Sequence, residues 1–187
     1  MFNKSARYWC VTDLETTGLI PGKHEIIQIG RVIVDAVEKR IYPELTMSCY
    51  VLPTRWDQRD LVSMKINRLT LPKLQGEGIP LDQALRAFVD GLDWQQTVLA
   101  GWGVAFEENF LKLAFETTGL DSPIHYKTVD IRSLAHLPRA KEGLVDYMGL
   151  GDACVHYGVP FDEAQLHDAL YDTTETAELA VKLLLRA

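Results

Sequence analysis

Residues 9–18 read Trp-Cys-Val-Thr-Asp-Leu-Glu-Thr-Thr-Gly, an apolar run that ends in two acids and a turn. Side chains alternate between the two faces of a β-strand, so Asp13 and Glu15 share a face. Two adjacent carboxylates repel each other unless one is protonated or a cation lies between them, and Mg²⁺ or Mn²⁺ prefers such oxygen ligands. Taken alone, the pair is better explained by a strand that reaches solvent. The case for a metal site therefore depends on the rest of the chain.

The next two apolar runs predict strands that pair with this one. Residues 25–36 are rich in Ile and Val and partly alternate with polar residues, and residues 46–52 form a shorter run that stops at Pro53. Such segments are typical of half-buried strands. Because the links between the three strands are brief, we expect them to be antiparallel.

The remainder of the chain alternates between helices and strands. Apolar residues at helical spacing predict helices over 80–89, 106–117, 144–155 and 169–186, and short apolar runs predict strands at 97–102 and 129–131. Three strands followed by alternating elements indicate an α/β fold, with a mixed sheet and helices packed on it. No linker rich in Pro, Gly or Ser divides the chain. We therefore expect a single domain over residues 1–187.

Composition sets wide limits on function. The chain has 187 residues, 47% of them hydrophobic, and a formal charge of -7, which makes no general case for nucleic acid but allows a local basic patch. Cys10, Cys49 and Cys154 lie far apart and predict neither disulfides nor a zinc site. The N-terminus lacks the apolar region of a signal peptide, and no apolar stretch approaches the ~20 residues of a membrane span. We expect a cytoplasmic protein without membrane contact.

Residues 54–73 differ from the rest of the chain in charge. They carry five Lys or Arg residues against two Asp residues, a net charge of +3, and Trp56 lies among them. A solvated surface segment would explain this composition. If the protein acts on a phosphate backbone, the segment is the best candidate to attract it and to stack a base.

A second group of polar residues, His167-Asp168-Ala169-Leu170-Tyr171-Asp172, precedes and begins the last predicted helix. Asp168 is a suitable N-cap, which leaves His167 outside the helix and Asp172 in its first turns. Five residues within a helix span about 500°, so His167 and Asp172 would diverge if both were helical. With His167 on the preceding loop, both side chains can face one site. Alone, a loop histidine and a helix-start acid need no function.

Together, the two groups match a known pattern. Asp13-Leu14-Glu15-Thr16-Thr17-Gly18 and His167-x₄-Asp172 resemble the first and third motifs of the DEDD superfamily of 3′→5′ exonucleases, in the DEDDh branch that includes ribonuclease T and the proofreading subunit of bacterial replicative polymerase. The sister branch has tyrosine four residues before the last Asp, where this chain has Asp168. The resemblance implies a ribonuclease H-like fold: a mixed five-stranded sheet, three antiparallel strands and then parallel ones, with helices on both faces.

The second motif of that family is matched less closely. Residues 101–111 resemble it and keep Phe106 and the downstream Phe110-Leu111. Gly103 stands where the family usually has Asn, and Glu107 where it usually has Asp. Glu107 is one methylene longer than Asp and could still reach a metal ion through water.

The resemblance implies a two-metal-ion phosphodiesterase that uses Mg²⁺ or Mn²⁺, two ions per site. Asp13, Glu15, Asp172 and Glu107 would hold the metal ions, and His167 would be the general base, a role that its near-neutral pKa suits. The 3′-terminal nucleotide would contact Thr16, Thr17 and Phe106. The expected activity is hydrolysis of single-stranded DNA or RNA from the 3′ end to nucleoside 5′-monophosphates.

The sequence leaves the function, the substrate and the oligomeric state open. The altered second motif is also compatible with a catalytically weakened ribonuclease H-like module that binds nucleic acid or a protein partner. If the protein is an exonuclease, its expected partner is the 3′ end of a single-stranded nucleic acid. The sequence decides neither between DNA and RNA nor between a monomer and a homodimer.

Overall fold

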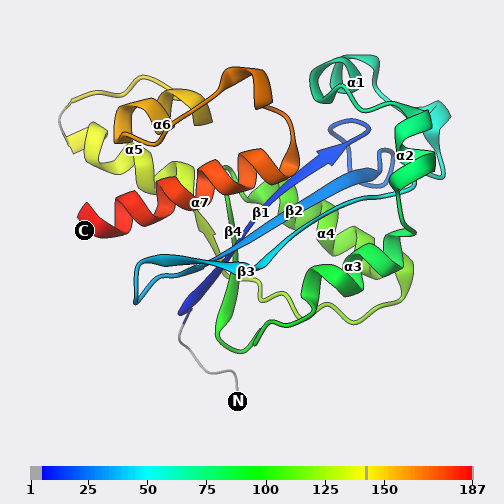
Figure 1. The fold of residues 1–187 in the computed structure, drawn as a ribbon, viewed down its shortest axis with the longest axis horizontal. Coiled ribbons are helices and arrows are strands. Elements are labelled where there is room, and N and C mark those ends of the chain that lie inside the picture. The colour runs from blue at the N-terminus through cyan, green and yellow to red at the C-terminus, as the bar shows by residue number, and fades with distance from the viewer. Residues whose placement is uncertain (1–5, 142, 187) are drawn as a thin grey trace.

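A computed structural model describes residues 6–141 and 143–186, which form one five-stranded sheet in the order β3-β2-β1-β4-β5 (Figure 1). Strands β1 (Tyr8–Thr16), β2 (Ile26–Asp35) and β3 (Arg40–Tyr50) pair antiparallel. Strands β4 (Thr97–Gly101) and β5 (Thr128–Asp130) continue the sheet in parallel from β1. This topology confirms the predicted mixed sheet.

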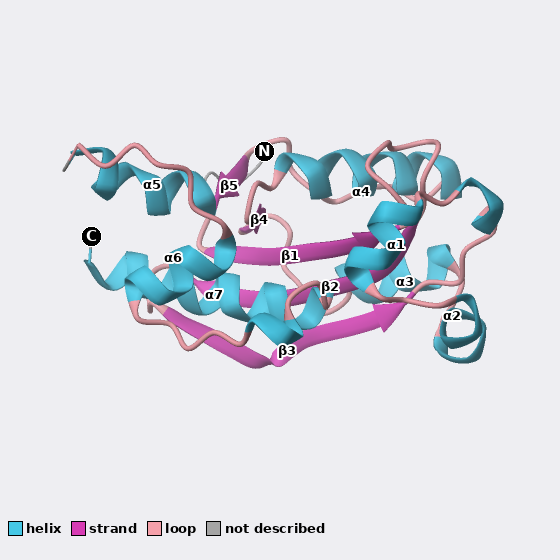
Figure 2. Ribbon diagram, turned by 90° about the horizontal axis from the view of Figure 1, so that it is seen from above, coloured by secondary structure: helices cyan, strands magenta, loops and turns pink. Residues whose placement is uncertain are grey.

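Alternation along β1 divides the core into two layers, one on each face of the sheet (Figure 2). Trp9 and Val11 pack against α5 (Ile131–Lys141), α6 (Leu150–Tyr157) and α7 (Ala169–Arg186). Cys10 and Leu14 face the opposite side, where α3 (Leu81–Val89) and α4 (Ala105–Thr118) cover the sheet. The predicted helices on both faces are therefore confirmed. Asp13 and Glu15 continue the series of Trp9 and Val11 and so project on the α7 side.

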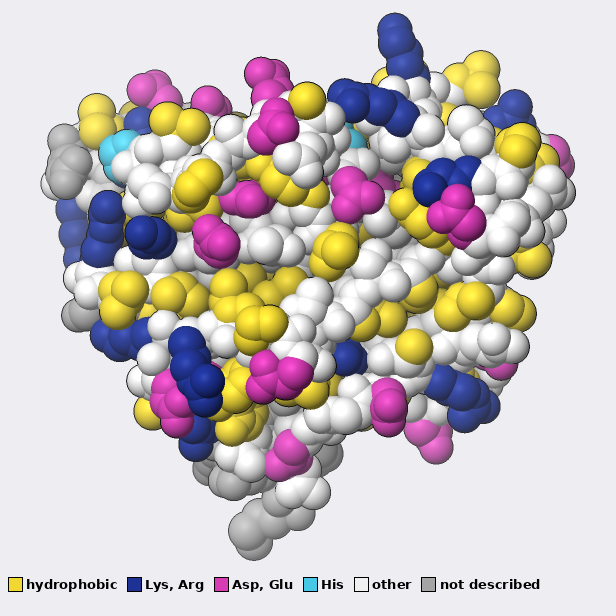
Figure 3. Space-filling view, in the orientation of Figure 1, with side chains coloured by type: hydrophobic (Ala, Val, Ile, Leu, Met, Phe, Trp, Pro, Cys, Tyr) yellow, Lys and Arg dark blue, Asp and Glu magenta, His cyan; other side chains and the backbone are white. Residues whose placement is uncertain are grey.

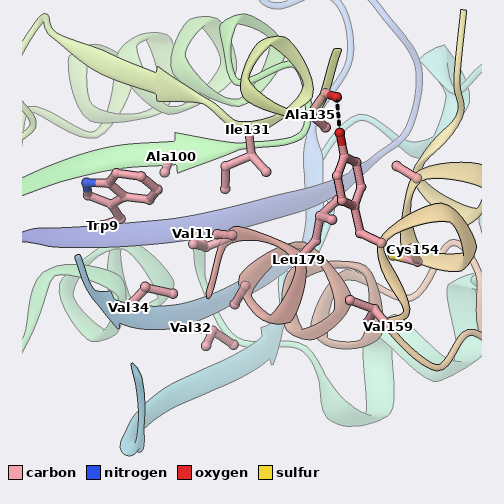
Figure 4. Packing of buried hydrophobic residues seen from close by; sticks show 14 of the residues in the cluster. Trp9, Val11, Val32, Val34, Ala100, Ile131, Ala135, Cys154, Val159 and Leu179 are labelled. Carbon is pink, nitrogen blue, oxygen red and sulfur yellow. Dashed lines mark hydrogen bonds between the residues drawn. The ribbon is translucent and has the colours of Figure 1, made fainter. Parts of the chain in front are cut away.

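The first of these layers is shown in Figure 4. Val11, Val32 and Val34 from the sheet meet Leu179 of α7, and Cys154 and Val159 close the layer from α6 and the segment after it. The Tyr157 hydroxyl donates to the carbonyl of Ala135, which ties α6 to α5. This packing holds α7 firmly over β1 and β2.

Gly30 lets the N-terminal turn of α7 lie directly on the sheet. Gly30 pairs with Asp13 across the β1–β2 ladder. A Cβ atom at position 30 would lie 2.2 Å from the carbonyl oxygen of Ala169 and 2.7 Å from the Thr173 hydroxyl, closer than any side chain permits. The missing side chain therefore brings the start of α7 next to the end of β1.

The structure differs from the sequence prediction at β3, which begins at Arg40 rather than near residue 46. This part of β3 contains Pro43, and proline cannot donate to a sheet ladder. However, β3 is an edge strand, and its pairing with β2 shifts register between Arg31 and Ile33, opposite this part of β3. An edge strand with a bulge accommodates a proline.

Three helices were not predicted, namely α1 (Leu61–Asn67), α2 (Leu71–Glu77) and α5. The short 3-10 helix η1 (Trp56–Gln58), which lies in the basic segment 54–73, was not predicted either. Helices α1 and α2 are seven residues long, too short for a clear apolar period. Pro138 lies inside α5 and obscured its pattern. The helix predicted over 144–155 is α6, which starts at Leu150 after the turn at Gly149. In the described part of the chain, no helix has the length and apolar character to cross a bilayer.

Candidate active site

The end of β1 opens into a cleft of about 410 Å³ that collects residues from distant parts of the chain. Asp13 and Glu15 come from β1, Glu107 from the first turn of α4, Asp172 from the first turn of α7, and His167 from the loop before α7. The structure thus brings together all the residues that the sequence predicted as catalytic. Thr16 and Phe106, predicted to bind substrate, also line this cleft.

Three ligand atoms in the cleft are close enough to bind one cation. One atom from each of Glu15, His167 and Asp172 lies within 4.8 Å of the other two. In addition, Glu107 Oε2 and Asp172 Oδ1 are buried without a hydrogen-bond partner among the described residues. Buried polar atoms are normally paired. Oxygen atoms left without a partner beside other acids fit a hard divalent cation, which would satisfy them.

The crowded acids hold their protons more strongly than acids in water. Burial raises the pKa of Glu15 to about 8, with further contributions from Asp172 and Asp168. Burial likewise raises the pKa of Glu107 to about 8 and that of Asp172 to about 6. The pKa of Asp13 lies well above its usual range, first because of burial and then because of Glu107, Glu15 and Asp172. A bound cation would replace these protons.

His167 is held in a strained backbone conformation at the cleft. Its φ of 68° is left-handed, which is uncommon for a residue with a side chain. The backbone N–H of His167 donates to Asp172 Oδ2 at 3.0 Å. Partial burial, and then the charge of Arg68, lowers the pKa of its imidazole. The lowered pKa favours the neutral form of the ring, which can accept a proton.

Gln28 and Asp168 fix the start of α7 on the sheet. The Asp168 carboxylate accepts from the N–H groups of Leu170 and Tyr171 at 3.1 Å each, so the predicted N-cap is confirmed. Gln28, in β2, donates to the same carboxylate at 3.0 Å and accepts from the N–H of Ala169 at 3.3 Å. Sequence analysis did not single out Gln28, although an amide inside an apolar strand was a usable signal.

Asn67, the last residue of α1, is a second residue that sequence analysis missed. Its side chain is buried, donates to the carbonyl of Thr16 at 3.1 Å and accepts from the N–H of Leu69 at 3.1 Å. A hydrogen bond from Asn67 also opposes the rise in the pKa of Glu15. Asn67 thus supports the part of β1 that carries the acids.

Thr17 is placed differently from its prediction. Its side chain is buried, and its hydroxyl accepts from the N–H of Glu25 at 2.9 Å. Thr17 is not among the residues that line the cleft. It belongs to the β1–β2 connection, because residue 17 already follows the end of β1 and leaves the alternation of the strand.

The fold and this acidic cleft define a class of protein, the metal-dependent nucleases with a ribonuclease H-like sheet. The family model described as exonuclease, RNase_T, matches residues 10–180. The chain belongs to this exonuclease family. The match confirms the resemblance to the DEDDh branch of 3′→5′ exonucleases that the two end motifs suggested.

Individual relatives agree with this assignment. Ribonuclease T from Haemophilus influenzae (strain PittEE) is 28% identical over 179 residues, which cover 90% of this chain and 76% of the relative. Ribonuclease T from Klebsiella pneumoniae is 26% identical over 189 residues, which cover 96% and 85%.

Solved structures share the fold. The nuclease domain of 3′hExo, a DEDDh family member bound to rAMP, superposes with a TM-score of 0.74 at 21% identity and covers 97% of this chain and 93% of that domain. Escherichia coli exonuclease I in complex with a dA16 oligonucleotide gives a TM-score of 0.77 at 16% identity, over 96% of this chain and 41% of that enzyme.

Proposed function

We propose that this protein is a Mg²⁺-dependent 3′→5′ exonuclease that releases nucleoside 5′-monophosphates from single-stranded DNA or RNA. One observation carries the proposal: β1, α4, α7 and the loop before α7 bring four acids and one histidine into a single cleft, with carboxylate oxygens that lack partners among the described residues. The family supplies the exonuclease class, and the cleft supplies the chemistry.

Each residue of the cleft has a defined part in this proposal. Asp13, Glu15, Asp172 and Glu107 would hold two Mg²⁺ ions, which when bound supply electrostatic stabilisation for phosphodiester hydrolysis. His167, neutral and next to the acids, accepts the proton of the attacking water. Thr16 and Phe106 contact the terminal nucleotide, and the Phe106 ring packs 4.8 Å from that of Phe110, which holds it in place.

Glu107 in place of the usual Asp is compatible with activity. Its side chain is buried, lies in the first turn of α4 and reaches the same cleft as the other acids. A module that had lost catalysis would have no reason to keep a buried, unpaired carboxylate there, since such a group destabilises the fold. Replacing Glu107 by Asp therefore tests whether the site is built around the longer side chain: a lower rate is expected.

The test of the proposal uses a 5′-labelled single-stranded oligonucleotide, as DNA and as RNA, with Mg²⁺. A ladder that shortens from the 3′ end is expected, abolished by EDTA and by Asp13→Asn. The matched control is Glu44→Gln, which neutralises an exposed acid on the edge strand β3 and should leave the ladder unchanged. No ladder on either substrate, together with no Mn²⁺ binding by calorimetry, would refute the proposal.

The proposal takes residues 1–187 as one exonuclease domain in the cytoplasm, and the continuous sheet from β1 to β5 supports the single domain. Cys10, Cys49 and Cys154 are free thiols, as a reducing compartment favours. Analytical ultracentrifugation would decide between a monomer and a homodimer.

A further inference from the structure

One wall of the cleft is built around Arg132. Arg132 lies in the first turn of α5 and lines the cleft together with Trp102, Gly103 and Glu107. The carboxylate of Asp130 accepts from the backbone N–H of Gly103 at 3.2 Å and from that of Arg132 at 3.1 Å. Asp130 thus caps α5 and also joins the start of this helix to the turn after β4.

Gly103 makes room for the Arg132 side chain. Its φ of 82° is left-handed, and a Cβ atom there would lie 3.3 Å from the guanidinium carbon of Arg132. Position 103 is the one where the family usually has Asn. In this chain, therefore, the guanidinium of Arg132 lies next to the place that an Asn side chain at position 103 would occupy.

The charge of Arg132 faces the cleft, where it also opposes the rise in the pKa of Glu107. It is the only Lys or Arg among the described residues that line the cleft, and the ion pairs found within residues 6–141 and 143–186 do not include it. It donates to the Tyr147 hydroxyl at 2.6 Å, and its guanidinium lies 5.7 Å from the centre of that ring. Tyr147 is 73% exposed, so an aromatic face and a cation stand together at this rim.

The Lys and Arg side chains of the basic segment 54–73 do not line the cleft, although Ser63, Ile66 and Asn67 of this segment do. Four of its cations are bound locally: Arg55 to the carbonyl of Gly22, Arg59 to that of Trp56, Arg68 to that of Ala164, and Lys73 to the carboxylate of Glu77. The Arg59 guanidinium also lies over the Trp56 ring, at 5.1 Å. On the face shown in Figure 3, Lys and Arg side chains are scattered among acids and apolar groups and form no continuous basic surface.

We propose that Arg132, with Tyr147 beside it, binds the phosphate backbone of the substrate strand just upstream of the terminal nucleotide. The inference rests on the proposed function, which places the terminal nucleotide against Thr16 and Phe106. The acids Glu107 and Asp172 are buried, whereas Arg132 reaches the exposed Tyr147, so a strand that leaves the cleft toward solvent on this side passes Arg132. There a guanidinium can form paired hydrogen bonds to a phosphate, and the Tyr147 ring can stack a base.

The test compares two substrates that differ in the upstream strand. A single-stranded oligonucleotide has upstream phosphates, whereas the p-nitrophenyl ester of thymidine 5′-monophosphate has none. Arg132→Ala and Arg132→Gln should raise KM for the oligonucleotide by about ten- to a hundredfold, the equivalent of one or two charge-assisted hydrogen bonds. Both variants should lower kcat/KM for the ester far less than kcat/KM for the oligonucleotide. Arg132→Gln keeps most of the side-chain length, so agreement between the two excludes a packing defect.

Lys141→Ala is the matched control, because it removes the same charge from the exposed last turn of the same helix. It should change neither KM nor kcat/KM for either substrate. A neutral methylphosphonate at the penultimate linkage should raise the KM of the wild type by a similar factor. It should raise the KM of Arg132→Ala little further.

Three outcomes are informative in different ways. If turnover of the ester falls as much as that of the oligonucleotide, Arg132 acts at the terminal nucleotide or on the acids, and the proposal is wrong. An unchanged KM for the oligonucleotide also overturns it. A wild-type protein that cleaves neither substrate refutes the proposed function itself, which is a separate result.

Discussion

Neutralising Glu107 should stabilise the protein when no metal is bound. Its side chain is 5% exposed, and burial raises its pKa from 4.5 to about 8. In the folded protein the carboxyl therefore keeps its proton up to about pH 8, whereas in the unfolded chain it ionises above pH 4.5. Between these values unfolding releases a proton, so the free energy of unfolding falls as pH rises. Below pH 4.5 both states are protonated and the effect vanishes.

The size of the effect follows from the pKa difference. At about 1.4 kcal/mol per unit, the penalty at pH 8 has an upper limit of roughly 5 kcal/mol. The titrations of the neighbouring acids are coupled to that of Glu107, and these acids ionise more readily once Glu107 is neutral. The gain in the free energy of unfolding is therefore smaller than this limit. For Glu107→Gln in EDTA we expect a gain of about 1–3 kcal/mol at pH 8, which corresponds to roughly 3–10 °C in Tm for a chain of this size.

Thermal unfolding followed by circular dichroism measures this gain. Wild type, Glu107→Gln and the surface control Glu44→Gln are compared in EDTA at pH 8.0 and pH 4.5, and again with Mn²⁺ at pH 8.0. The order should reverse with Mn²⁺, because the wild type then gains more from metal binding. If Glu107→Gln is no more stable than the wild type at pH 8.0 in EDTA, or gains equally at both pH values, the electrostatic argument is refuted.

Further predictions concern α7 and the metal. Gln28→Ala removes the hydrogen bonds to Asp168 and Ala169 and should lower the free energy of unfolding by about 1–3 kcal/mol in urea titrations; unchanged stability would contradict this role. Gly30→Ala places a Cβ 2.2 Å from the Ala169 carbonyl oxygen and should reduce exonuclease activity more than tenfold while the far-UV spectrum keeps its helical form. Calorimetry with Mn²⁺ at pH 7 in two buffers of different ionisation enthalpy should detect about one or more protons released per site, and equal heats would argue against protonated acids.

The first and third motifs of the site could be predicted from the sequence because their signals are local. Alternation along β1 placed Asp13 and Glu15 on one face, and the capping residue Asp168 separated His167 from the helix that carries Asp172. Each inference needs only a few consecutive residues. The sheet order followed from the same kind of pattern, since short links imply antiparallel strands and helical crossovers imply parallel ones.

The supporting residues could not be read in this way, because their partners are remote in sequence. Gln28 acts on a residue 140 positions away, and Asn67 reaches the site only because α1 folds against the β1–β2 connection. Composition alone also could not locate the cation in the cleft: residues 54–73 are basic, but Arg132 lines the cleft and their Lys and Arg side chains do not. Arg132 was overlooked because a single arginine at a helix start has no distinctive pattern.

The seating of α7 on Gly30 has a consequence for protein synthesis. Strands β1 and β2 leave the ribosome early, with Asp13 and Glu15 already in place, but Asp172 and the loop of His167 belong to the last part of the chain. A nascent chain without α7 has Asp13 and Glu15 on an uncovered sheet and lacks His167, the proposed general base. The cluster of four acids and one histidine would thus be complete only once the segment that carries His167 and Asp172 has also folded onto the sheet.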